Sequence, residues 1–318
     1  MIEVKNKTSK NISIRLLYEI ISIIKIGMKV KALNYDFVIF TVPSPLLLLL
    51  GVICKRNSFI VDIRDAVWEY LKNKGIVYVP FCILLNVVLK YSCRKAKFVT
   101  VTNIAEKKSI IKVTGVNPHI IKNGISKTLF DSLINREYEK GKSNSICITY
   151  LGNIGRAQHL DCLVKSVAND DRYSVSLVGS GVELKYLKRL RLELNAKNIF
   201  FKDNLPQSEL HKEFINSDVL YAQIGNDYSS AVPTKIFEYL TTGKHLLLGL
   251  PNGPAKKIFA SFSGVSIHEP ENQNDLLSVL DRIDFKSSVD REHNVNLLKK
   301  SYIRENEKEL LLALLREI

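Results

Sequence analysis

The second half of the chain alternates between short apolar runs and amphipathic stretches. Each apolar run between residues 146 and 267 is followed by a stretch whose apolar positions have helical spacing. Such alternation predicts βαβ units that build an α/β, doubly wound parallel sheet. The expected strands are Ile146–Leu151, Val175–Val178, Ile199–Phe201, Val219–Ala222, His245–Leu248 and Val265–Ile267. The expected helices are His159–Ala168, Glu183–Asn195, Gln207–Asn216, Thr234–Thr242, Pro254–Ser261 and Asn274–Ile283.

The first half follows the same alternation less regularly. Its expected strands are Phe37–Thr41, Phe59–Ile63, Phe98–Val101 and His119–Ile121. Its expected helices are Ile14–Ala32, Val79–Cys93 and a third that ends at Val113. We therefore expect a Rossmann-like N-terminal domain over 1–126, a polar linker over 127–145, a C-terminal domain over 146–290 and a closing helix over 291–318.

Two apolar runs in the first half, Val38–Cys54 and Ile76–Leu89, are interrupted by proline and are short for a membrane span. A buried strand with a core helix explains either run. For Ile76–Lys97 a second interpretation stays open, in which the outer face of a helix contacts lipid between flanking lysines and arginines.

Charge is distributed unevenly between the two halves. Residues 1–150 contain 24 Lys and Arg against 10 Asp and Glu, a net charge of +14, whereas residues 151–318 contain 22 of each. A basic half suits nucleic acid, an anionic membrane surface or a polyanionic substrate. Nucleic acid is the weakest of these partners, because no helix-turn-helix, zinc-finger or RNA-binding signature accompanies the charge.

Cysteine and histidine usage argues against a metal site. The five cysteines are scattered with no C-x-x-C pair, which indicates a reducing compartment without a disulfide framework. The six histidines have no metal-binding spacing, and there is no nucleophile elbow or P-loop. The first eleven residues are polar and lysine-rich, so no signal peptide is expected. We expect neither a bound metal nor a cofactor.

The segment 229–249 contains the most informative group of residues. Pro233 is expected to open a short helix, with Lys235 in its first turn and Glu238 on the same face. A lysine there opposes the helix dipole, so it is better placed for a bound anion than for the helix itself. Glu238 can accept hydrogen bonds from vicinal hydroxyls. The pair suits a nucleotide sugar; a capped surface helix before a core strand is the alternative.

Two glycine-containing turns follow expected strands in the same domain. Their residues are Gly152, Asn153, Gly155 and Arg156 in one turn, and Gly179 and Gly181 in the other. Glycine lets the backbone approach a ligand closely, and an arginine can hold a diphosphate through two hydrogen bonds. The spacing is not G-x-G-x-x-G, so a dinucleotide fingerprint is missing. Each turn alone is explained as an ordinary strand end, but together with Lys235 and Glu238 they indicate a ligand.

Charged residues also follow a strand in the first half. Arg64 and Asp65 come directly after Phe59–Ile63, where they would face the cleft of a two-domain protein. A salt bridge between arginine and aspartate on a loop is the alternative.

These segments together resemble the retaining glycosyltransferases of family 4, which have the two-domain GT-B architecture. The likeness is closest to bacterial enzymes of O-antigen, capsule and colanic-acid assembly, including transferases of N-acetyl-fucosamine. It rests on residues 61–65, 99–102, 122–125, 150–158, 177–181 and 232–240, which come in family order.

The resemblance implies a nucleotide-diphospho-sugar donor, expected to be a UDP-sugar, held mainly by the C-terminal domain. By position, Arg156 and Lys235 bind the diphosphate and Glu238 binds the ribose hydroxyls. The remaining donor-binding set implied by the resemblance is Gly152, Asn153, Gly155, Gly179, Gly181, Lys202, Leu205 and Pro233, with Lys202 and Leu205 beside the base. Arg64 and Asp65 join Arg156 and Lys235 as expected catalytic residues.

The resemblance also implies an acceptor on the basic half. This acceptor is a polyprenyl-diphosphate-linked saccharide, and it places the protein in the cytoplasm, peripheral on the inner face of the bacterial inner membrane. The anionic headgroup fits the charge of residues 1–150, which is a property of the composition and does not depend on the family.

Three departures from the family pattern matter. Ser230 stands where many relatives have a second glutamate, and Gln158 leaves the basic turn motif one cation short, so Lys235 is expected to compensate. The N-terminal domain is expected to be incomplete, because the chain begins after the first βα units of the family. A truncated GT-B remnant or partner subunit that binds nucleotide or membrane without transfer is therefore the alternative function, followed by a GT-B epimerase.

Overall fold

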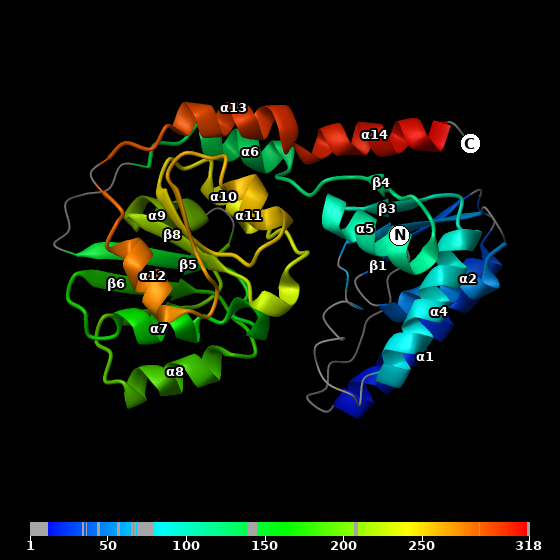
Figure 1. Cartoon of the computed structure of the whole chain (residues 1–318), viewed down its shortest axis with the longest axis horizontal. Coiled ribbons are helices and arrows are strands. Elements are labelled where there is room, and N and C mark those ends of the chain that lie inside the picture. The colour runs from blue at the N-terminus through cyan, green and yellow to red at the C-terminus, as the bar shows by residue number, and fades with distance from the viewer. Residues whose placement is uncertain are drawn as a thin grey trace. The chain divides into compact units, whose positions relative to one another are not determined.

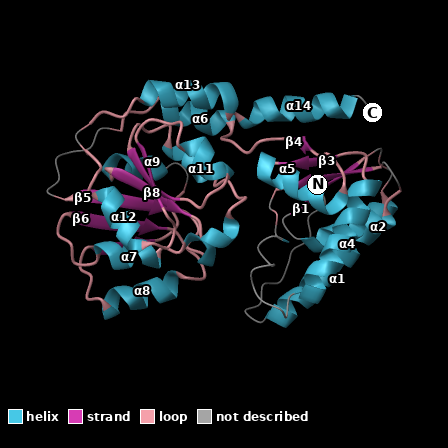
Figure 2. Cartoon of the chain, in the orientation of Figure 1, coloured by secondary structure: helices cyan, strands magenta, loops and turns pink. Residues whose placement is uncertain are grey.

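The computed structural model describes residues 12–33, 35, 37–42, 45–55, 58–64, 66, 68, 79–138, 145–206, 209–285 and 287–316. The chain forms two compact units, Met1–Lys122 and Asn123–Ile318. Each unit is an α/β unit with a parallel sheet, as Figure 1 shows along the chain and Figure 2 by secondary structure. Within the described ranges, no helix combines the length and the apolar character needed to cross a membrane.

The second unit is built on a six-stranded parallel sheet in the order β10-β9-β8-β5-β6-β7. Its strands are β5 (Ile146–Leu151), β6 (Tyr173–Val178), β7 (Ile199–Lys202), β8 (Val219–Gln223), β9 (His245–Gly249) and β10 (Val265–His268). All six lie within two residues of the expected positions, which confirms the doubly wound sheet. Chain order reverses between β5 and β8, and ligands of such sheets bind beside this point at the carboxyl ends of the strands.

Helices cover both faces of this sheet. One face packs against α7 (Asp161–Val167), α8 (Leu184–Glu193) and α12 (Gln273–Leu280), and the other against α9 (Leu210–Asn216), α10 (Lys235–Tyr239) and α11 (Pro254–Phe259). Successive side chains of a strand point to opposite faces, so Tyr221 belongs to the first core and Leu220 to the second. Near-continuous apolar strands are therefore required, and the sequence supplies them.

The expected linker over 127–145 is wrong for its first part. Residues Lys127–Ile134 form helix α6, because Ser126 caps its start and Phe130 and Leu133 are buried in the core. At the C-terminal end of α6, the Arg291 side chain donates hydrogen bonds to the carbonyls of Leu133, Ile134 and Arg136. Residues 139–144 lie outside the described part of the chain.

The expected single closing helix is also wrong, since the chain forms α13 (Arg291–Ser301) and α14 (Arg304–Arg316). Tyr302 leaves the helix and stacks on Phe237 with ring centroids 4.9 Å apart. Its carbonyl accepts a hydrogen bond from the Ile125 amide at 2.9 Å, and a one-pair bridge between Ile125 and Ile303 forms there. Packing and pairing at residues 302–303 thus interrupt a stretch that is otherwise helical.

The first unit contains a four-stranded parallel sheet in the order β1-β2-β3-β4. Its strands are β1 (Val38–Val42), β2 (Phe59–Ile63), β3 (Val99–Val101) and β4 (His119–Ile120). Its helices are α1 (Ile12–Ala32), the 3-10 helix η1 (Pro45–Leu49), α2 (Leu50–Ile53), α4 (Val79–Lys95) and α5 (Ile104–Thr114). The run Val38–Cys54 is therefore a strand followed by helical turns, as expected. Helix α4 buries one face, as the core-helix interpretation expects, and exposes the other.

Candidate functional site

Backbone hydrogen bonds join two turns and the end of strand β7 at the carboxyl edge of the second sheet. The Gly152 amide donates to the Val178 carbonyl at 2.9 Å, and the Ile154 amide donates to the Ser180 carbonyl at 2.8 Å. The Gly179 amide donates in turn to the Lys202 carbonyl at 3.0 Å. The turns after β5 and β6 and the end of β7 therefore form one continuous edge, with the two expected glycine turns side by side.

Gly152 and Gly179 have backbone conformations that only glycine adopts readily. Their φ angles are +132° and +144°. A Cβ on Gly179 would overlap the Gly152 carbonyl, and a Cβ on Gly152 would lie 2.8 Å from the Lys235 ammonium nitrogen. Both glycines thus allow close packing of backbone and ammonium at this edge.

The Lys235 ammonium lies at the centre of this edge. Its Nζ donates to the Tyr150 hydroxyl at 2.6 Å and lies 4.0 Å from the centroid of the Tyr150 ring. The Tyr150 hydroxyl donates in turn to the Asn153 carbonyl at 2.5 Å. The lysine at the start of α10 is thereby fixed against the glycine turn that follows β5, 85 residues earlier in the sequence.

Burial sets the proton affinity of the two charged residues on α10. Desolvation lowers the pKa of Lys235 to about 8, although the charge of Glu238 opposes that change. Desolvation raises the pKa of Glu238, while the charges of Lys235 and Arg304 hold it lower. A half-buried cation next to a half-buried carboxylate is costly to the free protein and is typical of a functional site.

Pro233 was expected to open this helix, and the expectation is wrong. Helix α10 begins at Lys235 after Thr234, and it spans only five residues. The hydroxyls of Thr241 and Thr242 donate to the carbonyls of Glu238 and Tyr239, so these last helical carbonyls have hydrogen-bond partners. Gly243 then reverses the chain with φ +72°. Lys235 and Glu238 remain one helical turn apart, as expected.

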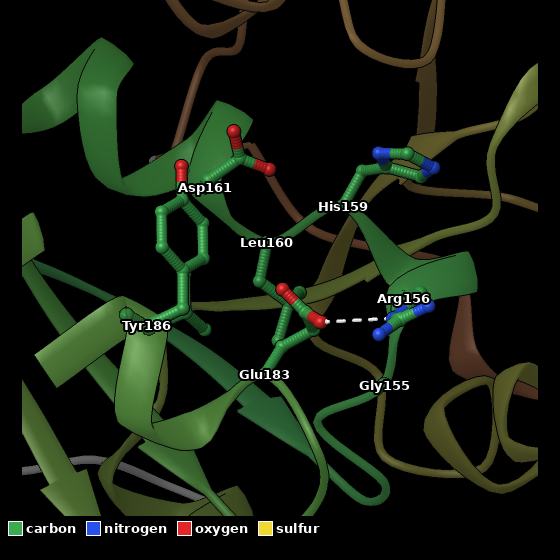
Figure 3. A pocket seen from close by; sticks show the side chains of 8 residues that line it. Gly155, Arg156, His159, Leu160, Asp161, Glu183 and Tyr186 are labelled. Carbon is green, nitrogen blue, oxygen red and sulfur yellow. Dashed lines mark ion pairs between the residues drawn. The ribbon is translucent and has the colours of Figure 1, made fainter. Parts of the chain in front are cut away.

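Arg156 lies at the rim of a cavity of about 350 Å³. The cavity is lined by the 3-10 helix η3 (Arg156–Gln158) and by the starts of α7 and α8, as Figure 3 shows. The Arg156 side chain is 83% exposed, and its Nε lies 3.4 Å from a carboxylate oxygen of Glu183. Such an exposed ion pair is weak, so the guanidinium can leave it for a stronger anionic partner.

The residues expected beside a base have other partners. The Lys202 ammonium donates to both carboxylate oxygens of Glu213 on α9, at 2.9 and 2.7 Å. Leu205 packs against the core. Between them, the Asn204 side chain donates to the Ser180 hydroxyl at 2.7 Å. This segment therefore lies next to the Gly179–Gly181 turn, through Asn204 rather than through the Lys202 side chain.

Arg64 belongs to the first unit, where it pairs with Asp62 at 2.8 Å. Asp62 is buried and also accepts hydrogen bonds from the Thr41 and Thr100 hydroxyls. The ion pair offered as the alternative for Arg64 is therefore present, although its partner is Asp62. Asp65 lies outside the described residues.

Two site residues were missed by the sequence reasoning. Tyr150 looks like an apolar strand residue, but a buried tyrosine hydroxyl needs a partner, and that need was the available signal. Gln223 at the end of β8 donates to the carbonyls of Gln158 and His159 at 3.1 and 2.7 Å. It thereby fixes the loop that presents Arg156. A buried glutamine at the end of an apolar strand was the signal for this contact.

Residues 131–283 match the family model described as Glycosyl transferases group 1. The second unit therefore contains a glycosyltransferase group 1 domain. The matched range includes both glycine turns, the end of β7 and helix α10. Within the described residues, no group of three or more His, Cys, Asp or Glu side chains is placed to hold a metal ion. A comparison with curated proteins found no match to this sequence.

Solved structures similar to the whole chain place the glycosyltransferase group 1 domain within a GT-B fold. Sucrose-phosphate synthase from Thermosynechococcus elongatus has a TM-score of 0.74 at 16% identity, covering 93% of this chain and 78% of that chain. The Anabaena protein HepE, solved with UDP and glucose, has a TM-score of 0.71 at 13% identity, covering 98% and 85%. The lipopolysaccharide outer core galactosyltransferase WaaB has a TM-score of 0.63 at 13% identity, covering 97% and 83%.

Proposed function

We propose that this chain is a retaining glycosyltransferase that moves a sugar from a nucleotide-diphospho-sugar to a lipid-linked saccharide. The observation that carries the proposal is the half-buried Lys235 ammonium, bonded to Tyr150 at the glycine edge, with Glu238 one turn away. A cation whose burial costs free energy in the empty protein gains most from an anionic ligand. The resemblance to family 4 and to the surface-polysaccharide enzymes supports the same reaction.

In this proposal, the donor lies along the carboxyl edge of β5, β6 and β8. Lys235 and Arg156 bind the diphosphate, and Arg156 exchanges Glu183 for it. Glu238 accepts hydrogen bonds from the ribose hydroxyls, and the turn 179–181 contacts the nucleoside. UDP is the expected nucleotide, in keeping with the UDP and glucose bound by HepE.

The chemistry needs stabilisation of the leaving group. The bond between the sugar C1 and the diphosphate oxygen breaks, and the acceptor hydroxyl bonds to C1 from the same face. Its proton passes to the departing diphosphate. Negative charge grows on the diphosphate in the transition state, and in this proposal the Lys235 ammonium and the Arg156 guanidinium stabilise it.

The proposed acceptor is a polyprenyl-diphosphate-linked saccharide of a surface polysaccharide such as O-antigen or capsule. Its diphosphate and the anionic lipid around it complement the basic first half of the chain. This acceptor implies a peripheral location on the inner face of the bacterial inner membrane. Arg64 remains a proposed contributor from the first unit, with Asp62 as its present partner.

The Glu238→Ala variant tests the ribose contact. It removes a charged acceptor of hydrogen bonds, so we expect about 10- to 100-fold weaker binding of UDP by isothermal titration calorimetry. Binding of inorganic pyrophosphate, which lacks ribose, should not weaken. The matched control is Glu193→Gln at the exposed end of α8, where UDP affinity should stay unchanged. Equal loss for UDP and pyrophosphate would remove Glu238 from the ribose site.

The pH dependence of UDP binding tests Lys235. In the free chain the Lys235 ammonium has a pKa of about 8, so it loses its proton around that pH. A bound diphosphate keeps Lys235 protonated to higher pH, because its negative charge stabilises the ammonium. Affinity should therefore be nearly constant below this pKa and fall above it, by roughly tenfold between pH 7 and pH 9. Calorimetry across this range measures the effect. A profile as flat as that of Lys235→Met would show that Lys235 does not pair with the diphosphate.

A further inference from the structure

The first unit exposes an apolar face on the outer side of its helices. Helix α4 buries Cys82, Leu85 and Leu89 on one side. On the other side Ile83, Leu84 and Val87 are each 60% exposed, and Tyr91 continues this stripe with four-residue spacing. Neighbouring large apolar side chains at this exposure mark an interaction surface rather than a solvated helix.

Exposed apolar side chains also occur on elements near α4 in the first unit. The 3-10 helix η1 contacts both α4 and α1, and it exposes Leu49. Helix α1 contacts η1 and α2, and it exposes Ile24 and Met28. We call the exposed large apolar side chains of α1, η1 and α4 the apolar face, which includes Ile24, Met28, Leu49, Ile83, Leu84, Val87 and Tyr91.

Basic residues accompany this face and acidic ones are scarce. Helix α4 contains Lys90, Arg94 and Lys95 and no acidic residue, and the Lys95 ammonium lies 5.4 Å from the centre of the Tyr91 ring. Helix α1 adds Lys25, Lys29 and Lys31 against Glu19. Apolar side chains with lysines and an arginine on the same helices complement an anionic lipid headgroup layer over an acyl layer. A protein partner would need its own acidic rim to match.

We infer that the apolar face of α1, η1 and α4 binds the surface of an anionic membrane, with its Ile, Leu and Val side chains in the headgroup–acyl boundary. The inference deepens the proposed function, because it identifies the surface that brings the chain to a lipid-linked acceptor. Only the identity of the acceptor depends on the proposed function. Binding to lipid requires neither nucleotide nor transfer.

Vesicle flotation of the full chain tests this inference. We expect binding to phosphatidylglycerol–phosphatidylcholine vesicles at least about tenfold tighter than to phosphatidylcholine alone, and weaker at high salt. The double variant Ile83→Gln/Val87→Gln should lose about tenfold or more of this affinity. The control Val182→Gln/Leu192→Gln changes two side chains that are 75% exposed on the second unit, and it should bind like the unchanged chain.

A fluorescence variant reports insertion directly. Trp68, the single tryptophan, is buried, so the Tyr91→Trp variant adds one exposed fluorophore to a constant background. Its emission should shift to the blue with anionic vesicles and be quenched by brominated lipid. The UDP-induced thermal shift should stay normal in every lipid variant, which separates failure of this inference from failure of the donor site. The inference would be overturned if the unchanged chain did not bind vesicles, or if Ile83→Gln/Val87→Gln bound them as tightly as the unchanged chain. It would also be overturned if the chain bound no vesicles but formed a dimer that Ile83→Gln/Val87→Gln dissociated.

Discussion

The Lys235→Met variant is expected to lose at least about a hundredfold in affinity for UDP and for pyrophosphate. In the unchanged chain the Lys235 ammonium is fixed at the glycine edge through the 2.6 Å hydrogen bond to Tyr150, whereas the Arg156 guanidinium is largely exposed. Charge-assisted hydrogen bonds to phosphate account for a loss of this size. Loss with both ligands distinguishes Lys235 from Glu238, whose removal should spare pyrophosphate.

The same variant should keep or gain stability without ligand. The pKa of Lys235 in the folded chain, about 8, lies below that of an exposed lysine, so the unfolded chain binds more protons between about pH 8 and pH 10. The charged lysine therefore destabilises the fold at neutral pH, and this cost fades as pH rises through that window. Methionine removes the cost, of the order of 1–3 kcal/mol, and Tyr150 keeps the Asn153 carbonyl as its acceptor.

Chemical denaturation measures the stability of the Lys235→Met chain, and calorimetry measures its affinity for UDP and pyrophosphate. The matched control is Lys197→Met, an exposed lysine just before β7 at the opposite edge of the sheet. It should change neither stability nor affinity by a measurable amount. A Lys235→Met chain that binds UDP normally, or that unfolds more easily by several kcal/mol, would contradict a ligand-binding role for this lysine.

The Gly179→Ala variant should damage both the fold and the donor site. The φ of +144° is outside the range that alanine adopts, and the added Cβ overlaps the Gly152 carbonyl. We expect the free energy of unfolding to fall by about 2–4 kcal/mol, because the turns after β5 and β6 must separate. UDP binding should fall below detection, since the same turns form the edge beside Lys235.

Gly243→Ala is the control for this prediction. Gly243 also has a positive φ, of +72°, but the Cβ of an alanine there would lie 3.1 Å from carbons of the Arg291 side chain and would not overlap a backbone carbonyl. A loss of about 1 kcal/mol with normal UDP affinity is expected there. Equal effects of the two substitutions would mean that backbone strain alone, and not the contact between the glycine turns, explains the Gly179 result.

The pattern of apolar positions predicts the second sheet well, because a parallel sheet covered on both faces needs apolar strands in every βα unit. It fails at α6, where Phe130 and Leu133 are buried and Leu129 and Ile134 pack on the same core, because the polar residues that follow obscure this helical spacing. It fails again at Tyr302 and Ile303, because their contacts with Phe237 and Ile125 are made across more than 60 residues of sequence.

The candidate site was predictable residue by residue but not as a set of contacts. Glycine turns and the spacing of Lys235 and Glu238 can be read locally. The bond from Lys235 to Tyr150 depends on the adjacency of β5 and β8 in the sheet, which the order of strands along the chain does not reveal. Likewise, nothing local indicates that Lys202 pairs with Glu213 or Arg156 with Glu183.

A thermal-shift titration of the full chain with UDP, GDP and their sugar conjugates tests the donor site most directly. A ligand that binds the native state raises the melting temperature in a saturable way. We predict such a rise for one nucleotide and its conjugates, preserved in Lys197→Met and abolished in Lys235→Met. No rise with any nucleotide, or an equal rise in Lys235→Met, would contradict a nucleotide-sugar site at this edge of the sheet.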